Sequence, residues 1–298
     1  MISGEYAVLE GAKALAVPTK HYGQYLNICN NTKPQYHWRS YDPSGLWFEA
    51  VFSNGLDEII SSSNASQAKL LHTLLQYIHQ QKPDLFATHW LVETQLQFPR
   101  AWGFGSSSSL IALLAKWSGI SPFTLLEKSF GGSGYDVAVA MENKPVIYQL
   151  SGLKHPDKQA YNGKYPTWGT TNFSPDFAEE LYLIYLNKKQ NSRSEIKKFR
   201  QNIIDENIID EISQLTENFT QTTDLKQFEI CMYEHEKLVS QLIGRPSIKE
   251  QMFKDYPHAI KSLGAWGGDF ILAAGTEAPE YFKAKSYETI LNFKDILI

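Results

Sequence analysis

A glycine–serine segment that leads directly into an apolar run constrains this chain more than any other feature. The segment reads Trp102-Gly103-Phe104-Gly105-Ser106-Ser107-Ser108-Ser109, and Leu-Ile-Ala-Leu-Leu-Ala-Lys-Trp follows it. Glycines let a backbone approach an anion and adopt positive φ. Serines are favoured helix caps, and the first N–H groups and the dipole of a helix attract negative charge. The segment therefore predicts a phosphate-binding helix start, and the alternative is a capped helix without a ligand.

The residues around this segment favour the phosphate-binding interpretation. An alternating strand is expected from His89 to Phe98, and a helix from Ser106 to about Trp117 ends at Gly119. Strand, loop and helix thus follow in the order that a phosphate loop requires. The segment lacks the G-x-x-x-x-G-K-[ST] pattern, so it is not a P-loop of the Walker type.

The rest of the chain mixes strands and helices without regular alternation, which predicts an α+β fold. Strands are expected in residues 14–28, 36–52 (two, around the turn at 42–45), 146–150, 181–186, 258–262 and 270–274. Helices are expected in residues 66–80, 121–130 and 192–243, the last range holding about three. Residues 152–176 show little periodicity and are interpreted as a loop at a domain boundary. The expected domains are therefore residues 1–175 and 176–298.

Composition excludes several classes of protein. The 298 residues carry a net charge of −4, with 43% hydrophobic and 20% charged residues, as in ordinary globular proteins. There is no basic run for nucleic acid and no apolar stretch long enough for a membrane span. Cys29 and Cys231 are too few for a disulfide framework and lack metal-ligand spacing. No secretory signal is visible at the N-terminus, so a cytoplasmic location is expected.

Three further motifs accompany the glycine–serine segment in chain order. They are Gly4-Glu5-Tyr6-Ala7-Val8-Leu9-Glu10-Gly11, then Gly132-Ser133-Gly134-Tyr135-Asp136-Val137-Ala138, and finally Gly264-Ala265-Trp266-Gly267-Gly268-Asp269. Together the four motifs resemble those of the GHMP family, the small-molecule kinases that act on galactose, homoserine, mevalonate and phosphomevalonate. The resemblance spans the whole chain. It implies a two-lobed fold, with an N-terminal lobe of mixed sheet and helices, a C-terminal α+β lobe and an active site between them.

The resemblance also implies ATP and Mg²⁺ as cofactors and assigns roles to residues. Asp136 matches the acidic residue that accepts a proton from the attacking oxygen. Ser107 matches the serine that meets Mg²⁺ and the terminal phosphates, and Glu127 lies near the position of a Mg²⁺-binding glutamate. The residues expected to bind the nucleotide are Trp102, Gly103, Phe104, Gly105, Ser106, Ser107, Ser108, Gly267, Gly268 and Asp269. The alternatives are a helix cap for Asp136 and a solvated residue paired with Lys128 for Glu127.

Within the family, the motifs resemble the phosphomevalonate kinase branch, with mevalonate kinase as the near neighbour. Tyr6 after Glu5, the run Gly-Tyr-Asp-Val-Ala and the closing Gly-Gly-Asp carry this likeness. The implied function is ATP-dependent phosphorylation of a mevalonate-pathway acid, by a monomer or homodimer. A phosphorylated substrate would need cations near Asp136, and the candidates by residue type are Lys154, His155, Lys158, Lys188, Lys189 and Arg193.

Two departures from the family pattern leave other functions open. The family's Gly-Lys strand before the Gly-Glu motif has no counterpart ahead of Met1. We expect the sequence to start at an internal methionine of a longer protein, and the alternative is a kinase that does without this strand. Trp266 stands where a glycine is usual; it could stack on adenine, fill part of the substrate site or simply pack. The alternatives are a kinase for another substrate and a degenerate member that binds nucleotide or metabolite without catalysis.

Overall fold

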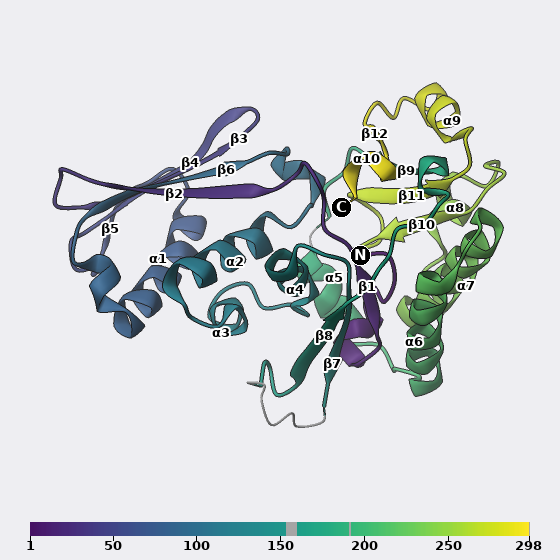
Figure 1. Ribbon diagram of the computed structural model, residues 1–298, viewed down its shortest axis with the longest axis horizontal. Coiled ribbons are helices and arrows are strands. Elements are labelled where there is room, and N and C mark those ends of the chain that lie inside the picture. The colour runs from purple at the N-terminus through teal and green to yellow at the C-terminus, as the bar shows by residue number, and fades with distance from the viewer. Residues whose placement is uncertain (153–159, 191, 298) are drawn as a thin grey trace. The chain divides into compact units, whose positions relative to one another are not determined.

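The computed structural model describes residues 1–152, 160–190 and 192–297, without the side chains of residues 192 and 193. The backbone forms two compact units, each assembled from separate segments (Figure 1). Unit 1 comprises Met1–Lys20, Ala101–Gly103 and Ala138–Ile298, and unit 2 comprises His21–Arg100 and Phe104–Val137. The two units are described separately. The division into residues 1–175 and 176–298 stays a prediction.

Unit 2 is built on one five-stranded sheet of order β2-β6-β3-β4-β5. Its strands are β2 (Gln24–Asn30), β3 (Tyr36–Asp42), β4 (Gly45–Phe52), β5 (Ile59–Ser62) and β6 (Trp90–Leu96). Its helices are α1 (Ala65–Gln81), α2 (Ser106–Ser118), α3 (Pro122–Glu127) and the start of α4 (Tyr135–Glu142). All strand pairs are antiparallel except β3 with β6.

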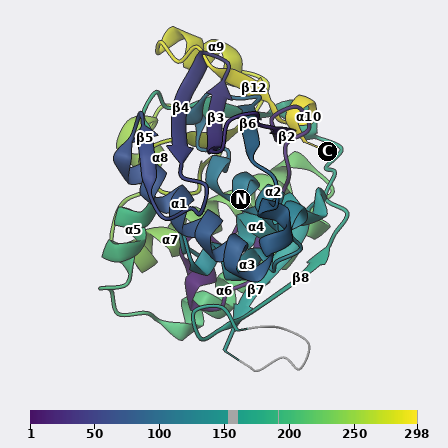
Figure 2. The ribbon, with the colours of Figure 1, turned by 90° about the vertical axis from the view of Figure 1, so that its left-hand side faces the viewer.

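Alternating burial explains how this sheet receives its helices. On β3, Tyr36, Trp38 and Ser40 are buried while the residues between them are more exposed, and β6 alternates in the same way. Helices α1 and α2 cover the buried side of the sheet (Figures 1 and 2). The ring of Trp117 on α2 meets Trp90 of β6 edge-on, with 5.9 Å between ring centroids. Packing against the apolar side of the sheet therefore positions α2 and the serines at its start, Ser106–Ser109.

Unit 1 contains two further sheets, and all of its strand pairs are antiparallel. The first has order β1-β7-β8, with β1 (Ala14–Ala16), β7 (Val146–Ser151) and β8 (Tyr165–Thr170). The second has order β10-β11-β9-β12, with β9 (Leu181–Tyr185), β10 (Ile260–Leu263), β11 (Phe270–Ala274) and β12 (Ile290–Asn292). The helices are α5 (Ser192–Phe199), α6 (Glu206–Gln221), α7 (Leu225–Ile243), α8 (Ile248–Met252), α9 (Ala278–Ala284) and α10 (Phe293–Ile296).

Two apolar clusters hold unit 1 together. One joins the N-terminal 3₁₀ turn (Ala7–Glu10) to α5, α6 and α7, and it includes Tyr6, Phe199 and Trp266. The other packs β9, β10 and β11 against α8 and α9 through residues such as Phe253 and Phe282. The N-terminal motif is therefore part of the core of this unit.

Most expected elements are confirmed, including the hairpin of β3 and β4 and the helices at residues 66–80 and 106–117. The expectation of a loop throughout residues 152–176 was wrong, because β8 pairs with β7 there. Pro166 and Gly169 obscured this strand, but both are tolerated because β8 lies at the edge of its sheet. Residues 14–28 form two strands in different units, and α3 ends at Glu127, before the expected residue 130. Among the described residues, no helix is both long and apolar enough to cross a membrane.

Candidate active site

Helix α2 begins at the glycine–serine segment without a side-chain cap. Gly105 occupies the N-cap position with φ 83° and ψ 36°, and no side chain at that position caps the helix. The hydroxyls of Ser108 and Ser109 instead donate to the Gly105 carbonyl oxygen, at 2.8 and 3.0 Å. The expectation that serines cap this helix was therefore wrong, because these hydroxyls bond backward to a carbonyl.

The start of α2 has the geometry of an anion site. The Ser109 N–H makes the first intrahelical bond, to the Gly105 carbonyl oxygen at 2.9 Å. The N–H groups before it belong to the first turn, where a helix provides no acceptor of its own. Ser107 is exposed there, whereas Ser108 is buried. An anion at this end would meet backbone N–H groups and the positive end of the helix dipole.

Asp136 shares unit 2 with this helix start. A run of glycines with positive φ, at Gly131, Gly132 and Gly134, turns the chain into α4. Asp136 is the second residue of α4, so it does not occupy the cap position before the helix. Its Oδ1 accepts the Val137 N–H at 3.0 Å, and the hydroxyl of Ser108, which donates to the Gly105 carbonyl oxygen, lies beside its carboxyl.

The environment of Asp136 favours proton acceptance. Burial raises the pKa of its carboxyl, while the neighbouring Ser108 hydroxyl and the Val137 N–H oppose that rise. A carboxylate with a raised pKa is a better base than an ordinary surface aspartate. The sequence did not single out Ser108 as the neighbour of Asp136; only the fold of unit 2, which brings Asp136 to Ser108, reveals it.

The described part of the chain offers no ready-made cluster of metal-binding side chains at the predicted metal residues. Glu127 is exposed at the last residue of α3, and Lys128 lies over the ring of Tyr77 at 5.6 Å. Residues 1–152, 160–190 and 192–297 contain no group of three or more His, Cys, Asp or Glu that could hold a metal. Nucleotide-bound Mg²⁺ takes most of its ligands from phosphate and water and needs only one or two protein oxygens. The hydroxyl of Ser107 or Ser108 and the carboxylate of Asp136 are of the required type.

The last motif forms the turn between β10 and β11 in unit 1, and we call Gly264–Asp269 the glycine turn. Gly264, Gly267 and Asp269 have φ values of 77°, 92° and 51°. The Asp269 N–H donates to the Lys188 carbonyl oxygen at 2.7 Å, and the Gln190 N–H donates to Asp269 Oδ1 at 3.2 Å. Gln190 Nε2 also donates to the Trp266 carbonyl oxygen at 2.8 Å. The segment after β9 thus holds this turn.

Close approaches explain why glycine is required at two of the predicted positions. A Cβ on Gly103 would lie 2.7 Å from the carboxyl carbon of Asp269, and one on Gly268 would lie 2.6 Å from the Lys188 carbonyl oxygen. Gly103 is therefore brought against the glycine turn within unit 1. Burial raises the pKa of Asp269, and the charge of Lys189 opposes that rise.

The cation candidates divide into two groups. Lys188 and Lys189 are exposed beside the glycine turn. Lys154, His155 and Lys158 lie outside the described residues, as does the side chain of Arg193.

The aromatic residues near these motifs are engaged in packing. Trp102 meets Phe270 edge-on at 5.7 Å between ring centroids. Phe104 packs against Phe98 at 5.8 Å. Trp266 is 2% exposed and belongs to the apolar cluster around Tyr6. The packing alternative for Trp266 is therefore the one observed.

No protein-family model matches the sequence, and no curated protein matches it either. Solved structures do match. A mevalonate kinase from Methanococcus jannaschii has a TM-score of 0.69 at 14% identity, covering 98% of this chain and 94% of its own. A phosphomevalonate kinase from Streptococcus pneumoniae, in complex with phosphomevalonate and AMPPNP, has a TM-score of 0.65 at 17% identity, covering 96% and 92%. The mevalonate kinase of L. major with R-mevalonate has a TM-score of 0.63 at 16% identity, covering 97% and 91%. The chain therefore has the α+β fold of the GHMP kinases.

Proposed function

We propose that this protein is an ATP-dependent kinase that phosphorylates a small mevalonate-pathway acid, with phosphomevalonate favoured and mevalonate next. The observation that carries the proposal is the start of α2, which has no side-chain cap at Gly105 and brings Ser108 to the carboxyl of Asp136. A candidate phosphate-binding helix start and a candidate base therefore both belong to unit 2.

The chemistry of phosphoryl transfer gives each residue a role. Such transfer requires positioning and charge stabilisation more than covalent participation. The N–H groups at the start of α2 would bind the triphosphate, and Asp136 would accept the proton of the attacking hydroxyl. Mg²⁺, when bound, would neutralise phosphate charge, with Ser107 or Ser108 as protein ligand and Glu127 as a further candidate. Gly267, Gly268 and Asp269 remain proposed nucleotide contacts.

The choice of substrate rests on likeness. The runs Gly-Tyr-Asp-Val-Ala and Gly-Gly-Asp resemble the phosphomevalonate kinase branch, and one structure of the same fold binds phosphomevalonate and AMPPNP. Exposed Lys188 and Lys189 supply positive charge beside the glycine turn. These features support an anionic substrate.

The test is ADP release from ATP and Mg²⁺ with phosphomevalonate, mevalonate, homoserine and galactose in parallel. We expect turnover of one acid and a fall in kcat of about 10²- to 10⁴-fold in Asp136→Asn, because the base is lost. Glu142→Gln is the matched control, since Glu142 lies on the same helix and bonds Trp168 Nε1 at 2.9 Å. This variant should retain wild-type turnover.

Two outcomes would contradict the proposal. Full activity in Asp136→Asn would remove its assigned role as base. Nucleotide binding without ADP release across the whole panel would instead support the alternative of a degenerate nucleotide-binding member of this fold.

A further inference from the structure

The Gly4-Glu5-Tyr6 segment has no role in the function proposed above, yet it is tightly fixed in the core of unit 1. Gly4 has φ 91°, and a Cβ there would lie 2.6 Å from Ala14 Cβ and 2.8 Å from Ala14 Cα. The Gly4 N–H donates to His235 Nε2 at 2.9 Å. Only glycine can occupy this position, so the backbone of the segment is held in one place.

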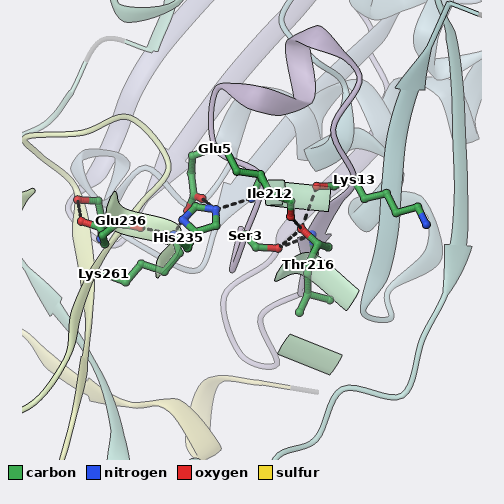
Figure 3. Close-up of polar contacts among 11 residues, drawn as sticks. Ser3, Glu5, Lys13, Ile212, Thr216, His235, Glu236 and Lys261 are labelled. Atoms are coloured by element: carbon green, nitrogen blue, oxygen red, sulfur yellow. Dashed lines mark hydrogen bonds and ion pairs between the residues drawn. The ribbon is translucent and has the colours of Figure 1, made fainter. Parts of the chain in front are cut away.

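Glu5 forms a buried ion pair with a residue of β10. Glu5 Oε1 lies 2.5 Å from Lys261 Nζ, and the two side chains are 1% and 0% exposed. Lys261 also donates to the Ser262 carbonyl oxygen at 2.9 Å. Figure 3 shows Glu5 and Lys261 reaching toward each other from segments far apart in sequence. Lys261 stands on the strand that leads directly into the glycine turn.

His235 is not a second charge partner of Glu5. Its Nε2 accepts the Gly4 N–H, so that nitrogen carries no proton. Burial, together with the charge of Lys261, holds the pKa of His235 well below its usual value. Glu5 Oε2 lies 3.3 Å from the same nitrogen, but two acceptors face each other there. The charge of Glu5 is therefore balanced by Lys261.

Tyr6 contacts the interior of the glycine turn. The Trp266 N–H donates to the Tyr6 hydroxyl oxygen at 3.0 Å. Burial raises the pKa of Tyr6, so the phenol stays neutral. Its ring packs against Phe199 with 5.5 Å between centroids. Two neighbouring residues thus contact the glycine turn in two places. Glu5 pairs with Lys261 on β10, just before the turn, and Tyr6 bonds to Trp266 within it.

We propose that Glu5 and Tyr6 are positioning residues that set the conformation of the glycine turn through Lys261 and Trp266. Replacing both partners of a buried ion pair by neutral residues is often tolerated, so such a pair is weak evidence for a role in stability alone. Its geometric effect here is to fix the strand that enters the turn. The consequence for nucleotide binding rests on the function proposed above; the consequence for the conformation of the turn does not.

The first test compares Tyr6→Phe with Tyr256→Phe by amide hydrogen exchange of residues 264–269 in the absence of ligand. Each substitution removes one buried phenolic hydroxyl that bonds to the backbone, since Tyr256 donates to the Ala274 carbonyl oxygen. Only Tyr6→Phe leaves the Trp266 N–H without its acceptor. We expect exchange in the turn to be about tenfold faster in Tyr6→Phe and unchanged in Tyr256→Phe.

A second variant guards against misfolding. Glu5→Gln alone would leave a buried cation without its anion, so the pair is replaced together as Glu5→Gln/Lys261→Met. We expect this variant to fold, to exchange faster in residues 260–266 and to raise KM for ATP about tenfold with a smaller change in kcat. A purely structural role would lower thermal stability without this split between KM and kcat.

The outcomes separate the two proposals. Unchanged exchange in the turn in both variants overturns the positioning role, even where the wild-type protein turns over substrate. Faster exchange with unchanged KM for ATP overturns the link to nucleotide binding. If the variants exchange faster but the wild-type protein releases no ADP with any substrate, the positioning role is supported and the kinase proposal is contradicted.

Discussion

The start of α2 and the glycine turn are both rich in glycine, but different parts of the chain hold them. At the start of α2, Gly105 and the hydroxyls of Ser108 and Ser109 bond to one another over a few residues. In the glycine turn, Trp266 is bonded to Tyr6 from the N-terminus and to Gln190 from the segment after β9. One conformation is local in sequence, and the other is imposed from a distance.

This difference has a practical meaning. The conformation of a local motif can be predicted from its own sequence, because the atoms that stabilise it belong to residues nearby in the chain. A turn held from a distance can be changed by substitutions that never touch it. The comparison therefore predicts that substitutions in the Gly4-Glu5-Tyr6 segment destabilise unit 1 more than substitutions in the glycine turn itself.

The largest expected effect comes from Gly4→Ala. Its Cβ would overlap the backbone of Ala14 at a positive φ. We expect the free energy of unfolding to fall by about 3 kcal/mol or more, from strain and steric overlap together. Urea denaturation monitored by circular dichroism measures this loss.

Gly264→Ala is the matched control within the glycine turn. Gly264 also has a positive φ, 77°, but a Cβ there meets no atom of the described chain within 4 Å. The cost should be only about 1 kcal/mol, from the left-handed backbone conformation. Equal losses in the free energy of unfolding would contradict the idea that the Gly4 position is sterically restricted whereas the Gly264 position has room for a side chain.

The next effect is a pH dependence of stability caused by Glu236. Burial raises the pKa of Glu236 to about 8, with Lys261 opposing and Glu5 reinforcing the rise. Between pH 6.5 and 8 the folded protein keeps a proton that the unfolded chain has already released. Stability therefore falls as pH rises through this window, by about 2 kcal/mol. Denaturation midpoints across these pH values provide the measurement.

Glu236→Gln isolates this contribution, because glutamine stays neutral and can still accept the Ser262 N–H that Glu236 Oε1 accepts at 3.0 Å. The variant should lose the fall in stability that Glu236 causes. Below about pH 6.5, the depressed pKa of buried His235 acts in the opposite sense, since the unfolded histidine gains a proton that the folded one refuses. The same slope in both proteins would exclude Glu236 as the cause.

The smallest effect is expected at the start of α2. Ser108→Ala removes a polar neighbour that lowers the pKa of Asp136. The acidic limb of kcat/KM against pH should then move to higher pH, because the base ionises at higher pH. Ser107→Ala, at an exposed position, should leave this limb in place. A shift of this limb in Ser107→Ala but not in Ser108→Ala would show that Ser107, and not Ser108, influences the pKa of Asp136.

Much of the fold could be predicted from local patterns. The turn at residues 42–45, the apolar face of α1 and the end of α2 at Gly119 all follow from periodicity and turn chemistry. Strand β8 could not be predicted, because its proline and glycine are tolerated only at a sheet edge. The partner of Asp136 could not be predicted either, because four neighbouring serines look alike in sequence.

By itself, the sequence determined the start of α2, the position of Asp136 after a glycine-rich break and the order of the motifs. These depend on bonds and steric limits within a few residues. Only the tertiary structure selected Ser108 among the serines, buried Trp266 in the core and paired Glu5 with Lys261. A buried ion pair depends on which distant segments exclude water together, and no local pattern encodes that.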